Sequence, residues 1–222
     1  MKFIFNIHRL IIRALFGKYS IQYIEFHRRR NARPDITPCL KDHYFPRFAP
    51  FFMKPKDSIL VRSSEEIIFK DIPFLKNLRT SGILNQAPQC FSCYRIGGDV
   101  LKVIGYQKES HDGKLRENYY FVNDLFTMGE FGFPDVQHRD IQVVLKDLFE
   151  KYGIEDRSLV DNFYIEDPQG SLIYFVNTGF SLYIRYFNQD NSDLYNRIEK
   201  WFEPSFKPSE ELKAKSKSRV DL

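Results

Sequence analysis

Two turn signals divide residues 162–187 into three short runs of β-branched and aromatic side chains. The first signal is Asp167–Gly170 and the second is Asn177–Gly179. Proline fixes φ near the value that a turn requires and glycine adopts positive φ without steric cost, so each signal marks a chain reversal. The runs between them predict three consecutive strands of an antiparallel sheet.

The faces of these strands predict how the sheet is covered. The middle run, Leu172–Val176, is apolar on both sides, which is typical of a central strand buried on both faces. In the last run, alternate residues separate into two sets. One face carries Phe180, Leu182, Ile184 and Tyr186, and the other carries Ser181, Tyr183, Arg185 and Phe187.

The residues before this meander supply further elements. Helical periodicity of Ile141, Leu145, Leu148 and Tyr152 predicts a helix that ends at Gly153. Proline near a helix start and glycine at its stop predict another helix from about residue 71 to Gly82. We expect strands at 90–96, 100–107 and 115–122, a loop rich in Gly and Phe at 127–134, and a last helix at about 194–202.

This element order predicts an α+β fold, with an antiparallel sheet of about five or six strands and two or three helices packed on it. We divide the chain into a basic amphipathic arm (1–33), an extended proline-rich strap (34–62), the globular domain (63–204) and a polar tail (205–222). The domain is long enough to bury a core of its own.

The arm begins with an amphipathic helix at residues 2–16. Lys2, Asn6, Arg9 and Arg13 form a narrow polar stripe, and apolar side chains cover the rest. The arginines interrupt what a secretory signal would need, whereas an Arg-rich, acid-poor helix is typical of mitochondrial targeting. The alternative is a permanent helix that contacts a partner or a membrane interface. The residues that we expect to dock there are Phe3, Phe5, Ile12 and Phe16.

The strap combines five prolines with six large apolar side chains between residues 44 and 53. Proline at this density excludes helix and sheet ladders, but a disordered linker has little use for such side chains. They pack either on the body of the same chain or on another subunit, and Phe48, Phe51 and Phe52 are the docking candidates.

Charge is distributed unevenly along the chain. Residues 1–33 have a net charge of +7, residues 34–206 of −5 and residues 207–222 of +2. Basic arms commonly meet phosphate, so Arg28, Arg29, Arg30 and Arg33 are candidates for contact with RNA or with anionic lipid. The alternative is a solubilising extension without a partner.

The three cysteines do not form a disulfide framework, since their number is odd, and they indicate a reducing compartment. Together with one histidine they match the ligand set of a Cys3His zinc site, made of Cys39, His43, Cys90 and Cys93. A regular strand at 90–96 would argue against this site, because it would point Cys90 and Cys93 to opposite faces. The alternative is that the cysteines are small apolar core residues.

Motifs of catalysis are missing from the sequence, which has no glycine-rich phosphate loop, no G-x-S-x-G and no H-E-x-x-H. We therefore expect a non-enzymatic accessory subunit of a larger assembly that acts through protein contacts, with no cofactor apart from the structural zinc. Its expected location is mitochondrial, on the matrix side or at the inner membrane, and the alternative is cytoplasmic. The competing functions are an accessory RNA-binding ribosomal protein and a bacterial chaperone or immunity-type binder.

Overall fold

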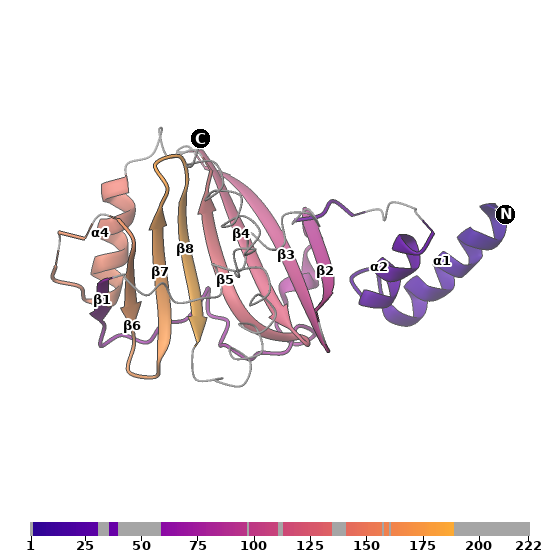
Figure 1. Cartoon of the computed structure of the whole chain (residues 1–222), viewed down its shortest axis with the longest axis horizontal. Helices are drawn as coiled ribbons and strands as arrows, with labels where there is room; N and C mark the ends of the chain where they lie inside the picture. The colour runs from indigo at the N-terminus through magenta and orange to yellow at the C-terminus, as the bar shows by residue number, and fades with distance from the viewer. Residues whose placement is uncertain are drawn as a thin grey trace, which may run out of the picture. The chain divides into compact units, whose positions relative to one another are not determined.

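In the described residues, eight strands form one sheet in the order β1-β6-β7-β8-β5-β4-β3-β2 (Figure 1). The computed structural model describes residues 2–30, 36–39, 59–96, 98–110, 113–134, 141–156, 158–159 and 161–188, which belong to one compact unit. Its helices are α1 (Lys2–Phe16), α2 (Ile21–Arg28), the 3-10 turn η2 (Ile83–Asn85) and α4 (Ile141–Tyr152). Its strands are β1 (Ile59–Arg62), β2 (Cys90–Ile96), β3 (Asp99–Ser110), β4 (Gly113–Val122), β5 (Leu125–Phe133), β6 (Phe163–Glu166), β7 (Ser171–Asn177) and β8 (Leu182–Asn188).

The α+β class is confirmed, but the expected number of five or six strands is wrong. Two of the eight strands form where the sequence pattern predicts none. Strand β1 lies within the predicted strap and pairs in parallel with β6, whereas all other neighbouring strands are antiparallel. Strand β5 occupies the predicted loop at 127–134 and joins the two halves of the sheet.

The predicted meander is confirmed as β6, β7 and β8, and Asp167 fixes its first turn. The Asp167 carboxylate accepts hydrogen bonds from the amides of Gln169 (2.9 Å) and Ser171 (2.7 Å), and from the amide of Ile67 at 2.8 Å. Gly170 supplies the left-handed conformation of the turn, with φ at 80°. The same side chain therefore closes a turn and ties the segment after β1 to the sheet.

Aromatic packing explains why β5 contains glycine. A Cβ atom on Gly129 would collide with the ring of Phe69, which packs over β5 between Phe131 and Tyr186. Glycine in a strand often marks such a close approach. The Gly/Phe pattern therefore reports a packed strand, although it resembles the composition of a loop.

The predicted helix at about 71–82 is wrong. Lys70, Asp71 and Leu75 have positive φ, and the backbone of this segment bonds to β5. The amide of Leu75 donates to the carbonyl of Phe126, and that of Leu78 to the carbonyl of Asp124, both at 2.8 Å. The apolar spacing that resembles a helix instead anchors an irregular segment on the core, where Leu78 is buried.

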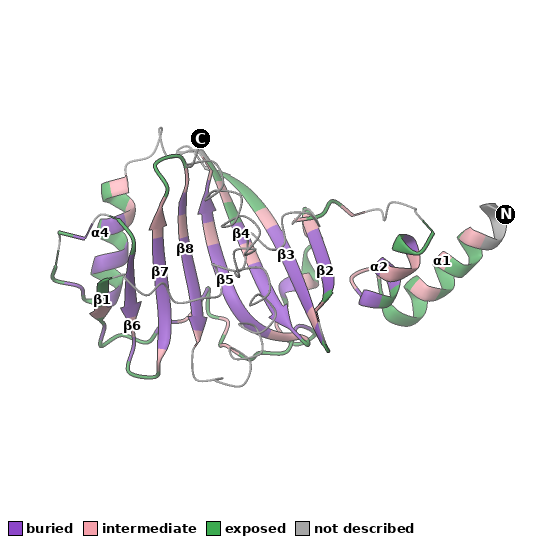
Figure 2. Ribbon diagram, in the orientation of Figure 1, coloured by how far each residue is buried: buried purple, intermediate pink, exposed green. Residues whose placement is uncertain are grey.

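One face of the sheet packs against α4, as the sequence predicts. Leu145, Leu148, Phe149 and Tyr152 of α4 are buried in the same core as β6, β7 and β8. Figure 2 shows the strands mostly buried along their length. The segment around Phe69 and helix α2 extend this core towards β2.

The opposite face of the sheet is also buried and contains an ion pair. Nε of Arg185 on β8 lies 2.7 Å from Oε2 of Glu130 on β5, and both side chains are at least 95% buried. Asn118 on β4 donates to Oε1 of Glu130 at 2.9 Å. Burial of both faces of the sheet agrees with the prediction that the central strand is apolar on both sides. The ion pair between Arg185 and Glu130 was not predicted.

Several sequence predictions fall on residues that the structure does not describe. They are the last helix at about 194–202, the polar tail and most of the proline-rich strap.

Candidate functional site

Helices α1 and α2 form a short hairpin whose turn is specified by two residues. Gly17 ends α1 in a left-handed conformation (φ 83°), and its amide donates to the carbonyl of Arg13 at 3.0 Å. Ser20 caps α2, because its hydroxyl accepts from the amide of Tyr23 at 3.1 Å and donates to the carbonyl of Gly17 at 2.9 Å. The turn is therefore closed by its own hydrogen bonds.

The inner face of α1 packs on α2. The ring of Phe5 stacks on Phe26 with centroids 5.3 Å apart and meets the edge of the buried His27 at 5.8 Å. Ile12, two turns further, packs against the hydrophobic core. Phe5 and Ile12, which the sequence suggested as docking residues, thus hold the hairpin together.

The outer face of α1, defined as Ile7, Leu10, Ile11, Ala14 and Leu15, is apolar and exposed. These residues follow the spacing i, i+3, i+4, i+7 and i+8, so they share one side of the helix, opposite Phe5. Their large side chains are exposed by 41% (Ile7), 58% (Leu10), 48% (Ile11) and 71% (Leu15). Figure 2 shows α1 as mostly exposed. Half of the large exposed apolar side chains of the described residues lie on this helix.

Helix α2 joins the hairpin to the edge strand β2. Tyr19 contacts the ring of Phe91 at 5.2 Å, and Glu25 forms an ion pair with Arg95 at 3.3 Å. Tyr23 is fully buried. The hairpin is therefore packed on the domain.

The predicted arginine cluster lies at the C-terminal end of α2. Arg28, Arg29 and Arg30 are exposed, and cations are favourable there because they complement the helix dipole. Arg29 also lies 3.7 Å from the carboxylate of Glu25, and the guanidinium of Arg30 lies 4.3 Å from the ring centre of Phe26. Arg33 is outside the described residues.

Of the four predicted zinc ligands, the structure brings two together. The odd cysteine count favours free thiols in a reducing compartment, but this expectation is wrong for two of them, because Cys39 forms a disulfide with Cys90 on β2, with Cα atoms 4.8 Å apart. The disulfide lies beside Gly105, where a side chain would collide with Cys90. Cys93 points to the other face of β2, where burial raises the pKa of its thiol to about 12. His43 is outside the described residues. Because the disulfide uses the thiols of Cys39 and Cys90 and Cys93 lies on the other face of β2, the described cysteines are not arranged as the predicted Cys3His site.

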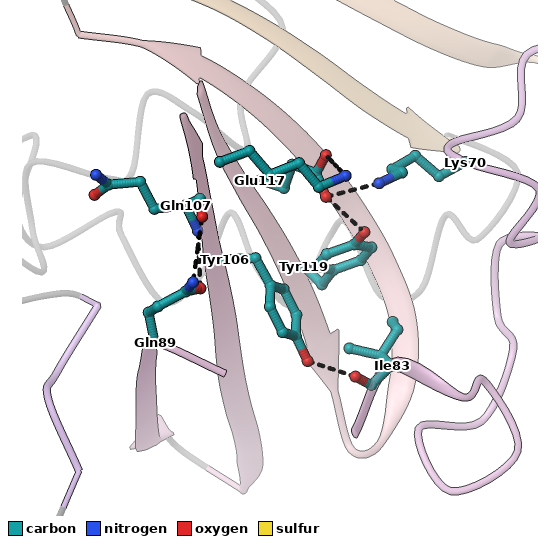
Figure 3. A network of polar contacts seen from close by, with 8 residues as sticks. Lys70, Ile83, Gln89, Tyr106, Gln107, Glu117 and Tyr119 are labelled. Carbon is teal, nitrogen blue, oxygen red and sulfur yellow. Dashed lines mark hydrogen bonds and ion pairs between the residues drawn. The ribbon is translucent and has the colours of Figure 1, made fainter. Parts of the chain in front are cut away.

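A second polar cluster surrounds Glu117 on β4, at a cavity of about 510 Å³ (Figure 3). The Nζ atoms of Lys70 and Lys108 lie 2.7 and 2.9 Å from the two oxygens of this carboxylate, and Tyr119 donates to it at 3.4 Å. Burial opposes ionisation, but the hydrogen bonds and charges of the two lysines outweigh it and lower the pKa of Glu117. A carboxylate held ionised in this way is a weak proton acceptor, so the cluster is suited to structure more than to proton transfer.

Tyr106 closes the same cavity on the β3 side. Its hydroxyl donates to the backbone carbonyl of Ile83 and lies 3.2 Å from that of Gln86. Burial raises its pKa to about 12, so the phenol stays protonated near neutral pH. This pairing fixes η2 against the sheet.

The outer face of α1 is the feature that the sequence did not single out. The sequence places apolar residues almost all around the helix, so only the position of α2 identifies which side stays exposed. Phe16 is exposed by 52% and lies at the end of that surface. The side chain of Phe3 is not described, and Phe48, Phe51 and Phe52 lie outside the described residues.

No protein-family model matches this sequence, and no curated protein or solved structure matches it either. Among the described residues, no helix is long and apolar enough to cross a membrane. The same residues contain no group of three or more His, Cys, Asp or Glu side chains arranged for a metal ion.

Proposed function

We propose that this protein is a non-enzymatic accessory subunit that the α1–α2 hairpin attaches to an anionic membrane surface. The α+β domain then contacts other subunits of a larger assembly. The observation that carries the proposal is the exposed apolar outer face of α1, in an arm whose net charge is +7.

Apolar burial supplies the first driving force. A helix that lies in the plane of a membrane places apolar side chains at the boundary of headgroups and acyl chains. Ile7, Leu10, Ile11 and Leu15 have this arrangement, and each fully buried side chain of this size contributes about 1.5–3 kcal/mol. Exposure of this apolar surface to water is unfavourable, and a contiguous exposed apolar patch is typical of an interaction site.

Charge supplies the second driving force. The first 33 residues have a net charge of +7, with Glu25 as their single acid. Each basic residue near an anionic leaflet contributes about 1 kcal/mol. The body is mildly acidic, so attraction to a negative surface orients the hairpin towards it.

The aromatic contacts favour a membrane over single-stranded RNA. Binding of single strands needs exposed rings on which bases stack. Phe5 and Phe26 stack on each other, Arg30 covers Phe26, Tyr23 is fully buried, and Tyr19 contacts Phe91. The rings near the arginines are thus already engaged within the protein.

For the membrane itself we propose the mitochondrial inner membrane. The support is compositional, because the arm is rich in arginine, amphipathic and poor in acids.

Sedimentation with phosphatidylcholine vesicles, with and without phosphatidylglycerol, tests the proposal on the full chain. Leu10→Asp should weaken binding by at least about tenfold, since it removes apolar contact and places a charge in the interface. The matched control is Val143→Asp on α4, where Val143 is exposed by 51%. This control should bind like the wild type.

Salt separates the two driving forces. Changing Arg28, Arg29 and Arg30 to Gln should weaken binding about fivefold per arginine at low salt and leave a salt-resistant remainder. Equal binding by wild type and Leu10→Asp would contradict the proposal. RNA binding that Leu10→Asp leaves intact, without vesicle binding, would support the ribosomal alternative instead.

A further inference from the structure

A cavity of about 530 Å³ lies between the α1–α2 turn and the hairpin turn that joins β4 to β5. Residues 15–22 form one wall, and residues 123 and 124 form part of the other. Its volume falls in the range of about 300–1,000 Å³ that is usual for small-ligand sites. Leu15, at the end of the outer face of α1, is one of the lining residues.

The charges around this cavity are mainly positive. Lys18, Arg79 and Lys102 line it, and Asp124 is the single acid among the lining residues. Asp124 is already paired with Lys102, whose side chain is only 11% exposed. Within the described residues, neither Lys18 nor Arg79 has an ion-pair partner. The lining therefore has an excess of two positive charges, which fits a phosphate group.

Apolar side chains complete the lining. Leu15 and Phe16 lie at the end of the outer face of α1, and Leu84 and Val100 are half-buried deeper in the domain. A cavity that combines an excess of positive charge with apolar lining side chains suits an anion that carries hydrocarbon.

We infer that this cavity binds the phosphate headgroup of a single phospholipid, with the acyl chains continuing along the outer face of α1. The inference rests on the proposed membrane attachment and names its ligand. Lys18 and Arg79 contact the phosphate, while Asp124 holds Lys102 in position at the floor. The hairpin thereby recognises a headgroup in addition to a charged surface.

The test uses two soluble probes and the full chain. Glycerol 3-phosphate presents the headgroup alone, and dihexanoyl phosphatidic acid adds two short acyl chains. Titration calorimetry should give at least about tenfold tighter binding for the lipid, because its chains cover Leu15 and Phe16. Equal affinity for both probes would identify a site for soluble phosphate esters and overturn the lipid assignment, as would the absence of binding.

Variants locate the binding in the cavity. Lys18→Gln with Arg79→Gln should weaken binding of the short-chain lipid by at least about tenfold, because each charge-assisted hydrogen bond is lost. Arg62→Gln with Lys114→Gln removes the same charge from exposed residues outside the cavity and should leave binding within about twofold. Arg79→Gln alone is a second variant, since Arg79 is exposed and its change leaves the turn intact. Unchanged affinity in both cavity variants overturns the inference.

Leu10→Asp separates this inference from the proposed function. It should lose vesicle binding and keep its affinity for glycerol 3-phosphate, because this probe has no acyl chain to reach the outer face of α1 and Leu10 does not line the cavity. A wild type that binds the short-chain lipid but no vesicles would retain the site and contradict membrane attachment. Vesicle binding without any binding of the soluble lipid would overturn the headgroup site alone.

Discussion

Glu117 carries its negative charge in a nearly buried position, between Lys70 on an irregular segment and Lys108 on β3. Lys70 and Asp71 form a two-residue turn with φ of 52° and 60°, between the bridged residues Phe69 and Ile72. Left-handed conformations cost about 1–2 kcal/mol in residues other than glycine. The ion pair with Glu117 is one contact that compensates for this cost.

Replacement of Glu117 by Gln should lower the free energy of unfolding at neutral pH by about 1–3 kcal/mol, because it removes the negative charge between two ammonium groups and turns one acceptor oxygen into an NH2 donor. The pKa of Glu117 is lowered in the folded state, so its stabilisation is present above the unfolded pKa and is lost as pH falls through the folded pKa. The difference from wild type should therefore begin to shrink as pH falls below the unfolded pKa of about 4.3 and should disappear only below the lower folded pKa.

Urea denaturation at a series of pH values measures this difference. Glu150→Gln is the control, since Glu150 is exposed and lies 3.9 Å from Lys146. It should change stability by less than about 0.5 kcal/mol. A Glu117→Gln variant as stable as wild type at neutral pH would show that the two lysines contribute nothing there.

At the scale of elements, the close approach of Phe69 to Gly129 of β5 predicts that a larger residue at this position destabilises the protein. Gly129→Ala places a methyl group where the ring of Phe69 lies and should destabilise the protein by about 1–3 kcal/mol through overpacking. Gly98→Ala is the matched control, because its new Cβ would meet no atom within 4 Å. Thermal unfolding followed by circular dichroism compares them, and equal midpoints would show that Phe69 moves away without cost.

Elements with a regular period and clear end signals were predictable. Helices α1 and α4 have apolar faces of helical spacing, each ended by a glycine, and the meander has strong turn residues between strands. The spacing of apolar residues was enough to predict the secondary structure of these segments, because each of them packs a regular face on the core.

Elements that depend on distant partners were not predictable from local pattern. Strand β5 has glycines because Phe69 packs on it, and the segment around Leu75 is held by β5 and not by its own helical bonds. Strand β1 has four residues that gain their partner from β6, about a hundred positions later. In each case the tertiary contact decides the conformation.

The candidate site shows the same division. The arginine cluster could be predicted, because three of its arginines are consecutive in the sequence. The outer face of α1 was not, because the side that stays exposed depends on where α2 packs. The cavity was also hidden, since Lys18, Arg79 and Lys102 come from three separate segments.

For the molecule as a whole, the contacts of α2 with β2 join the hairpin, through which we propose membrane attachment, to the domain. Tyr19, Tyr23 and Glu25 connect the hairpin to the sheet edge, so a hairpin that lies on a membrane holds the sheet beside it. The opposite charges of arm and body favour one orientation of approach.

The most direct test of membrane attachment through α1 is the depth of its outer face in a bilayer. A nitroxide label on Ile11→Cys, bound to vesicles of phosphatidylcholine and phosphatidylglycerol, reports that depth by power-saturation electron paramagnetic resonance with oxygen and a nickel chelate. Membrane attachment through α1 predicts a label about 5–10 Å inside the interface. The same label on Val143→Cys of α4 should remain in water. A label at residue 11 that is as accessible to the nickel chelate as the one at residue 143 would contradict membrane attachment through α1.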